Sequence, residues 1–284
     1  MAADERRGRG RAFVMLARAV TEALRRAPLL ALAASLGLLA CSGCAGSDER
    51  ELSPEDYLGI LRQLGSYDRT VVQEAVRQIM RHPRSPTVAA LQTTLREGRW
   101  DLRVKVQIAR ILAIWPDPQT GQIDRTGLRE LIEGLRSPES DLREVACALL
   151  PLFGPEVVPH VADVLASGQK ANRYAACEVL GTILRDTQDR GAGEALRDRI
   201  MKEEDREVRM LLVINLAGWT NREAIGGFIN ALTDPDEGCR EYAWLEIKKR
   251  ADPPVEFDWR GSVARRSDAV QKLRSWWSKT TNRE

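Results

Sequence analysis

Histidine is scarce in this sequence, and its scarcity bears on catalysis. The 284 residues include only two histidines, His82 and His160, which lie far apart and have no serine or cysteine nucleophile patterned around them. A catalytic triad or a histidine-based metal site needs such groups at matching positions. The Walker pattern and G-x-G-x-x-G are also missing. We therefore predict no catalytic residues, no metal site and no cofactor, and a protein that is not an enzyme.

Two further shortages narrow the fold class. Alternating runs of β-branched residues are missing, so nothing predicts a β-sheet. Aromatic residues make up only 5% of the chain, whereas alanine, leucine, arginine and glutamate, which favour helix, are common. With 43% apolar and 30% charged residues, the composition is typical of a helical protein with a sizeable core.

An excess of positive charge is missing as well. The formal net charge is +2, but residues 1–40 hold seven of the 43 basic residues and three of the 41 acids. The remainder has 36 basic and 38 acidic residues, a net charge of −2. Proteins that bind nucleic acid usually carry a basic stripe, so we expect no nucleic-acid partner.

What the sequence does contain is a pattern repeated six times. An acid or glutamine stands four residues before each anchor position, and apolar or small residues stand three, four and seven residues after it. The anchors, spaced 30 to 38 residues apart, are Val72, Lys105, Arg143, Arg173, Arg209 and Arg240. A unit of about 30–40 residues repeated in this way predicts a solenoid, in which helical pairs bury apolar stripes against their neighbours.

The segment at residues 137–165 carries the pattern most plainly, with a charged turn, an aliphatic-Arg pair, small residues, leucine and glycine, then Pro155-Glu156 and an aliphatic helix. It resembles a HEAT-like repeat of the bacterial type also found in PBS lyases, and the resemblance covers residues 53–250. It implies an all-α, right-handed α-α superhelix of about six helical pairs. Residues 251–284 are expected to form a C-terminal cap, with a helix from Ser267 to Lys279 that covers the exposed end of the array.

The basic anchors form a ladder whose role has two interpretations. Its residues are Lys105, Arg143, Arg173, Arg209 and Arg240. The ladder could hold an anionic partner, or it could pair with the acid of the next repeat and fix the register of the stack. We favour the structural interpretation, because each cation has its own acid. The acid column lies at expected helix starts, where a carboxylate accepts backbone N–H groups.

The aromatic and sulfur-containing residues are expected mainly in the core. Core packing is the first interpretation for four tryptophans, and an exposed tryptophan or Tyr174 would suit a binding anchor. The four are Trp100, Trp115, Trp219 and Trp244. Trp276 and Trp277 cannot both point inward on one helix, so one is expected at the surface. Cys147, Cys177 and Cys239 are expected to be buried free thiols.

The first forty residues read as an export signal. Arg25-Arg26 precede an uncharged apolar run at Ala27–Ala40, which is too short for a spanning helix and suits a signal peptide. The run ends in Leu38-Leu39-Ala40-Cys41, which resembles the bacterial lipobox. The resemblance implies cleavage, a lipid-modified Cys41 at the new N-terminus, and a tether over residues 41–52. The alternatives are an uncleaved anchor from Ala27 to about Gly46, lipidation at Cys44, or translation from Met15.

Two functions follow from this organisation. The first is a non-enzymatic scaffold, tethered to the bacterial cell envelope on its periplasmic or outer side, that binds a protein partner on the concave face of the second helices. The second is a small-molecule enzyme or carrier that uses the groove, as in tetrapyrrole lyases. A pocket lined by convergent polar groups would favour the second function. Neither the identity of the partner nor the oligomeric state follows from the sequence.

Overall fold

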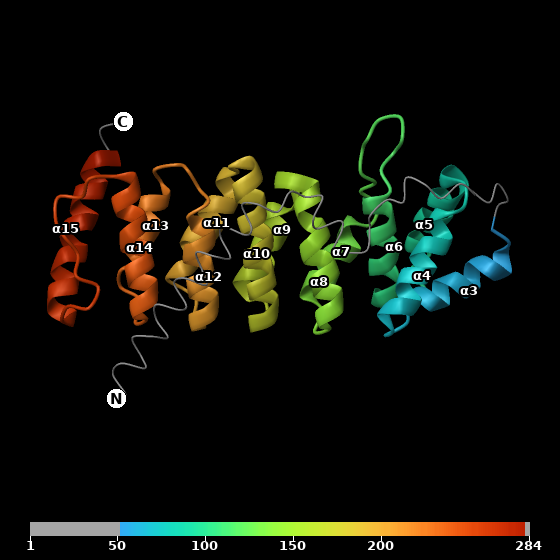
Figure 1. The fold of residues 1–284 in the computed structure, drawn as a ribbon, viewed down its shortest axis with the longest axis horizontal. Coiled ribbons are helices and arrows are strands. Elements are labelled where there is room, and N and C mark those ends of the chain that lie inside the picture. The colour runs from blue at the N-terminus through green and yellow to red at the C-terminus, as the bar shows by residue number, and fades with distance from the viewer. Residues whose placement is uncertain (1–51, 282–284) are drawn as a thin grey trace. The chain divides into compact units, whose positions relative to one another are not determined.

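The computed structural model describes residues 52–281, and within that range all the regular secondary structure is helical (Figure 1). The described residues divide into two compact units, 52–160 and 161–281. In each unit the helices pack in repeating pairs, the arrangement of an armadillo/HEAT-like solenoid. The predicted all-α solenoid is therefore confirmed, while its right-handed sense stays a prediction. The predicted signal peptide, Cys41 and nearly all of the tether lie outside the described residues.

The first unit contains three helical pairs and a 3-10 segment. In chain order its elements are α3 (Pro54–Leu64), α4 (Arg69–Met80), α5 (Arg84–Glu97), α6 (Leu102–Ile114), α7 (Leu128–Arg136), α8 (Ser140–Leu149) and η1 (Leu150–Val157). Ser53 caps α3 by accepting a hydrogen bond from the backbone N–H of Asp56, with Pro54 in the first turn. Helix α6 packs against α3 and α5 on one side and against α7 and α8 on the other, so it is buried along most of its length.

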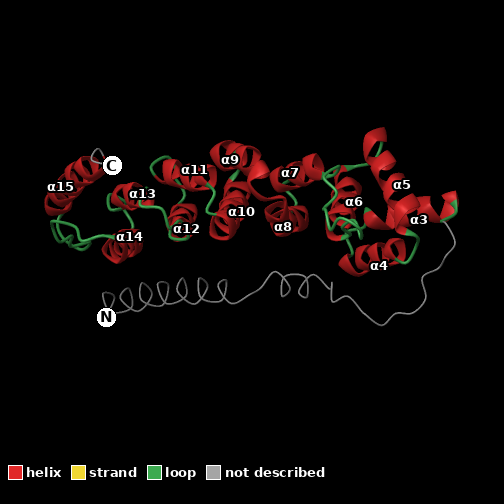
Figure 2. Cartoon of the chain, turned by 90° about the horizontal axis from the view of Figure 1, so that it is seen from above, coloured by secondary structure: helices red, strands yellow, loops and turns green. Residues whose placement is uncertain are grey.

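The second unit is a regular two-layer stack. Its elements are α10 (Lys170–Thr187), α11 (Arg190–Ile200), α12 (Arg206–Leu216), α13 (Ala224–Ala231), α14 (Glu237–Arg250) and α15 (Val263–Thr281), preceded by the end of α9 (Val158–Ser167). Helices α11 and α13 pack side by side in one layer, and α10, α12 and α14 form the other (Figure 2). The second helix of each pair therefore belongs to a continuous layer within this unit.

The repeated acids begin the second helices as predicted. Asp68, Asp101, Asp205 and Asp236 are each the N-cap residue of their helix, and each side chain accepts a backbone N–H from the first turn. These bonds satisfy donors that a helix leaves unpaired at its start. Glu139 and Gln169 occupy the same position without a capping bond from their side chains.

The core follows the repeat columns. Every residue three or seven positions after an anchor has 0% exposure, in both units. These residues are Ala75, Ile79, Ile108, Leu112, Ala146, Leu150, Ala176, Leu180, Leu212, Leu216, Ala243 and Ile247. The small residues allow close approach of neighbouring helices, and the large ones fill the seam between pairs. The predicted buried columns are confirmed.

The C-terminal segment covers the last helical pair. Phe257 is buried, with its ring centroid 5.9 Å from that of Trp244 on α14. Helix α15 packs on α13 through Val270 and Leu273. It begins at Val263, four residues earlier than the predicted Ser267, because the hydroxyl of Ser262 accepts the backbone N–H of Arg265 at the start of the helix.

One stretch among the described residues, Ser140–Ser167, is long and apolar enough to cross a membrane by length and composition alone. It comprises α8, η1 and α9, and it is broken at Gly154, whose φ of 69° is followed by Pro155. Its α8 part packs against α7 and buries Leu142, Ala146 and Leu149. The apolar residues of α8 are thus those of a repeat core.

Candidate protein-binding surface

The ladder side chains close the turns between paired helices. The guanidinium groups of Arg143, Arg209 and Arg240 each donate to two carbonyls, five and six residues earlier, at 2.6–3.2 Å. Arg173 donates to the carbonyl of Gly168 at 2.9 Å, and Lys105 donates to that of Gly98 at 3.1 Å. Each cation thus satisfies carbonyls that the preceding turn leaves without a helical partner.

Two ladder residues also reach the next repeat. Arg173 forms a two-point pair with Glu203, at 2.8 and 2.6 Å, and Arg209 pairs with Asp234 at 2.7 Å. The side chain of Glu203 is fully buried and accepts a second cation, Arg199, at 3.0 Å. Burial alone would raise the pKa of Glu203, but the hydrogen bonds from Arg173, the backbone and Arg199 outweigh it and lower that pKa.

The acids that receive the ladder are not the predicted helix-start acids. Glu203 and Asp234 lie two residues before the N-cap aspartates, inside the turn. The N-cap aspartates pair instead with a cation of the previous repeat, the residue directly after its N-cap. Lys170 lies 3.0 Å from Asp205, and Arg206 lies 2.7 Å from Asp236. A pattern in the sequence could have identified Glu203 and Asp234. Both lie six residues before an anchor, in the turn between paired helices, and Ser66 and Ser137 occupy the same position in other repeats. Each of these four side chains accepts the backbone N–H two residues later.

These contacts bear on the two interpretations of the ladder. Its cations are engaged by turn carbonyls and by neighbouring carboxylates, and Arg240 also donates to the carbonyl of Trp259 in the cap. Arg240 is buried, and its burial lowers its pKa. All five cations hold the turn of their own pair, and Arg173, Arg209 and Arg240 also reach the segment that follows, so the contacts favour the structural interpretation over an anion-binding ladder.

The outward side of the second helices is the remaining candidate surface. In the second unit, the residues one and five positions after each anchor lie on α10, α12 and α14 away from the first-helix layer. We call this set the second-helix face; its residues are Tyr174, Glu178, Met210, Ile214, Glu241 and Leu245. Tyr174 is 40% exposed, Glu178 is exposed, and Ile214, Glu241 and Leu245 are half-buried. Apolar side chains left open on three neighbouring helices are typical of a docking surface.

The corresponding positions on one helix of the first unit, α6, are different. On α6 they are Val106 and Arg110, and both are buried. Nearby, Arg103 is buried as well; its guanidinium lies 4.0 Å from the ring centroid of Tyr67 and pairs with Glu139 and Asp141. These two positions of α6 are therefore not available at the surface, because α6 is packed on both sides.

The tryptophans divide between core and surface. Trp219 and Trp244 are buried, whereas Trp100 and Trp115 are half-buried against the core of the first unit. Trp276 and Trp277 are both half-buried, so neither is fully at the surface as predicted for one of them. Each borders a different surface hollow beside α15.

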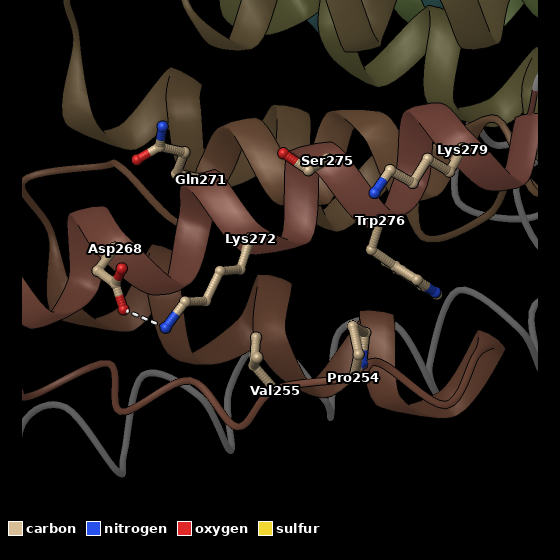
Figure 3. A pocket seen from close by; sticks show the side chains of 8 residues that line it. All are labelled: Pro254, Val255, Asp268, Gln271, Lys272, Ser275, Trp276 and Lys279. Atoms are coloured by element: carbon tan, nitrogen blue, oxygen red, sulfur yellow. Dashed lines mark hydrogen bonds and ion pairs between the residues drawn. The ribbon is translucent and has the colours of Figure 1, made fainter.

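The two hollows have mixed linings. The first measures about 600 Å³, and in it Trp276 extends from α15 toward the side where Pro254 and Val255 lie, with Lys272 paired to Asp268 (Figure 3). The second measures about 550 Å³ and lies between α11, α13 and α15, where it includes Arg197 and Trp277. Across residues 52–281 no group of three or more histidines, cysteines, aspartates or glutamates could hold a metal ion.

The thiols take no part in a surface site. Cys177 and Cys239 are buried and free, as predicted, and burial raises the pKa of Cys177 to about 12. Cys239 lies with its Sγ 3.5 Å from the Sδ of Met210. Cys147 is only half-buried, which differs from the prediction.

The architecture defines a helical-repeat scaffold, a class of protein consistent with protein binding. Residues 128–209, in the middle of the chain, match the family model for HEAT repeats. Among solved structures, the designed armadillo repeat protein YIII(Dq)4CqI is similar over 68% of this chain and 99% of its own, with 14% identity and a TM-score of 0.38. No curated protein matches the chain.

Proposed function

We propose that the protein is a membrane-tethered, non-enzymatic scaffold that binds a protein partner through the second-helix face of its second unit. The observation that carries the proposal is a group of partly exposed apolar side chains on three adjacent helices: Tyr174, which is 40% exposed, and the half-buried Ile214 and Leu245. Repeat proteins of this class commonly use such extended faces for binding. An interface needs an apolar centre with a polar rim, and this face has both.

Partner capture from the solubilised envelope tests the binding role. The wild-type protein is compared with Ile214→Asp, which places a charge in the centre of the face, and with Met201→Asp, an exposed residue outside it. We expect Ile214→Asp to reduce capture of a specific protein at least about tenfold, since a buried unpaired charge at an interface costs several kcal/mol. Circular dichroism establishes that both variants are folded. Equal capture by all three proteins would contradict the proposal.

The membrane tether is proposed from the sequence around Cys41. The basic pair Arg25-Arg26, the apolar run and the lipobox-like residues support export to the cell envelope and lipidation. One acyl chain binds membranes only marginally, whereas two give stable attachment. Mass spectrometry of the mature protein is expected to find acylated Cys41 and no residues 1–40. An intact leader, or unchanged membrane attachment in Cys41→Ala, would contradict this part of the proposal.

A further inference from the structure

The apolar residues of the second-helix face lie along a diagonal. Tyr174 and Met210 are the first-row residues of α10 and α12, and Ile214 and Leu245 are the second-row residues of α12 and α14. Each row change is one helical turn, because the rows lie four residues apart. Since α12 packs against both α10 and α14, the four side chains form one band across three helices. Met210 is buried and forms the floor of this band.

Two carboxylates occupy the corners that the band leaves open. Glu178 lies one turn after Tyr174 on α10, and Glu241 lies one turn before Leu245 on α14. They therefore flank the band on opposite sides, one near each end. The proximity of Glu178 to Tyr174 is reflected in the pKa of that tyrosine, which desolvation and then the charge of Glu178 raise.

Among the described residues no cation forms an ion pair with Glu178 or Glu241, although Arg260, which pairs with Glu237, interacts with the charge of Glu241 from a distance. The surrounding charges are engaged elsewhere: Lys170 pairs with Asp205 and Glu207, Arg206 with Asp236, and Lys248 with Glu256. Arg185, two turns beyond Glu178, donates to Asn215 and Thr182. The unpaired charge beside the apolar band is thus negative on both sides.

The environment of Glu178 disfavours its ionised form. Although Glu178 is exposed as a residue, the protein atoms packed around it partly desolvate its carboxyl group and raise its pKa, and the more distant Arg185 offsets only part of that shift. A cation placed beside this carboxylate by a partner would stabilise the ionised form. Carboxylates that lack a partner in the free protein gain most from such a cation, because no existing ion pair must be broken.

We propose that the second-helix face recognises a basic amphipathic helix of a protein partner, with an apolar stripe on the band and a lysine or arginine against each of Glu178 and Glu241. This inference rests on the proposed function and names the chemistry of its partner. Packed helices lie about 8–10 Å apart, so the band spans about 20 Å. A partner helix of roughly 14 residues covers that length at 1.5 Å per residue. An amphipathic helix with cations on both flanks of its apolar stripe matches both features.

Two labelled model peptides test the proposal. Both have 18 residues with leucines at the same helical spacing; the polar positions are lysine in one and glutamate in the other. Fluorescence anisotropy measures their binding to the full chain in neutral detergent, with detergent alone as the blank. We expect the lysine peptide to bind at least about tenfold more tightly, since two interfacial charge pairs are gained with it and two repulsions arise with the other.

Charge-reversal variants distinguish recognition by Glu178 and Glu241 from attraction to the net charge of the protein. In Glu178→Lys/Glu241→Lys the preference is expected to switch to the glutamate peptide. The matched control Asp163→Lys/Asp252→Lys makes the same change in net charge on α9 and in the connection after α14, and it is expected to keep the wild-type preference. Equal binding of the two peptides, or a switch in the control, would overturn the proposal.

The outcome is distinguishable from failure of the proposed function. If Ile214→Asp abolishes capture of the native partner while Glu178→Lys/Glu241→Lys leaves it unchanged, the face binds a protein but the basic chemistry is wrong. If wild type prefers the glutamate peptide, the partner is acidic and the inference is also wrong. If a peptide of residues 21–40 binds more tightly than the lysine peptide and displaces the native partner, the face receives the chain's own leader, which would overturn the proposal of a separate partner helix.

Discussion

At the scale of single residues, the stability of the second unit depends on a buried carboxylate that joins two repeats. Glu203 accepts hydrogen bonds from Arg173, Arg199 and the backbone N–H of Asp205, and its side chain is fully buried. We predict that Glu203→Gln lowers the free energy of unfolding by about 1–3 kcal/mol at pH 7, because charge-assisted hydrogen bonds are lost and two cations lose their counter-charge. Urea unfolding measures the loss.

The pH dependence of that loss has a definite sign. Because the fold lowers the pKa of Glu203 below its ordinary value of 4.5, its contribution is fully present above pH 4.5 and disappears as the pH falls through the lowered pKa. The difference between wild type and Glu203→Gln should therefore shrink in acid. The neighbouring residue Glu204 is exposed, and Arg209 donates a hydrogen bond to its backbone carbonyl and not to its side chain. Glu204→Gln therefore provides the control. An equal effect at both positions would refute this account.

The same residues show what the sequence could predict at this scale. The N-cap aspartates could be predicted because capping depends on local spacing, which one sequence displays. The pairing of Arg173 with Glu203 could not be predicted, because it depends on how one repeat is positioned against the next. The turn column that contains Glu203 mixes serine, aspartate and glutamate, so its shared role as an acceptor is visible only once the turns are compared in three dimensions.

At the scale of elements, the close contact of α10 and α12 depends on one glycine. A Cβ added to Gly181 would lie 2.2 Å from the side-chain amide of Asn215. That amide cannot move without cost, since it accepts from Arg185 at 2.8 Å and donates to the carbonyl of Cys177 at 3.2 Å. We predict that Gly181→Ala destabilises the protein by about 1–3 kcal/mol, as overpacking of a core does, and thermal unfolding measures it.

A second helical glycine supplies the comparison. A Cβ at Gly59, within α3, would meet nothing within 4 Å. Gly59→Ala should therefore stabilise the protein slightly, by about 0.5–1 kcal/mol, because alanine restricts the unfolded chain and favours helix. Destabilisation of similar size at both glycines would show that the approach of α10 to α12 is not what Gly181 provides.

The elements themselves were largely predictable, and the exceptions have physical reasons. The column of acids and glutamine before the anchors located the start of each second helix, since its residues are the N-caps of those helices. The early start of α15 was missed because Ser262 and Ser267 are both suitable caps, and only the structure shows that Ser262 accepts a backbone N–H of the first turn. The burial of α6 was missed because its sequence carries Arg103, Gln107 and Arg110, which an outward helix face would also carry.

At the scale of the molecule, the repeated pattern predicted a stack of similar pairs but not its division at residue 160. The anchors on either side of that division, Arg143 and Arg173, are separated by the same kind of interval as the others. The division instead falls shortly after the 3-10 segment η1, in which Gly154 is non-helical and is followed by Pro155. The repeated sequence pattern shows which side chains each repeat buries. It does not show how the chain divides into compact units.

The two compact units are expected to respond separately to a loss of core packing. Leu180 and Leu112 are both fully buried in equivalent columns, Leu180 in the second unit and Leu112 in the first. Replacing either with alanine should cost about 2–5 kcal/mol. Each repeat in such a protein is stabilised mainly by its nearest neighbours. Amide hydrogen exchange should therefore accelerate within residues 161–281 for Leu180→Ala and within residues 52–160 for Leu112→Ala. Uniform acceleration across residues 52–281 in both variants would mean that the chain unfolds as one cooperative body despite its two compact units.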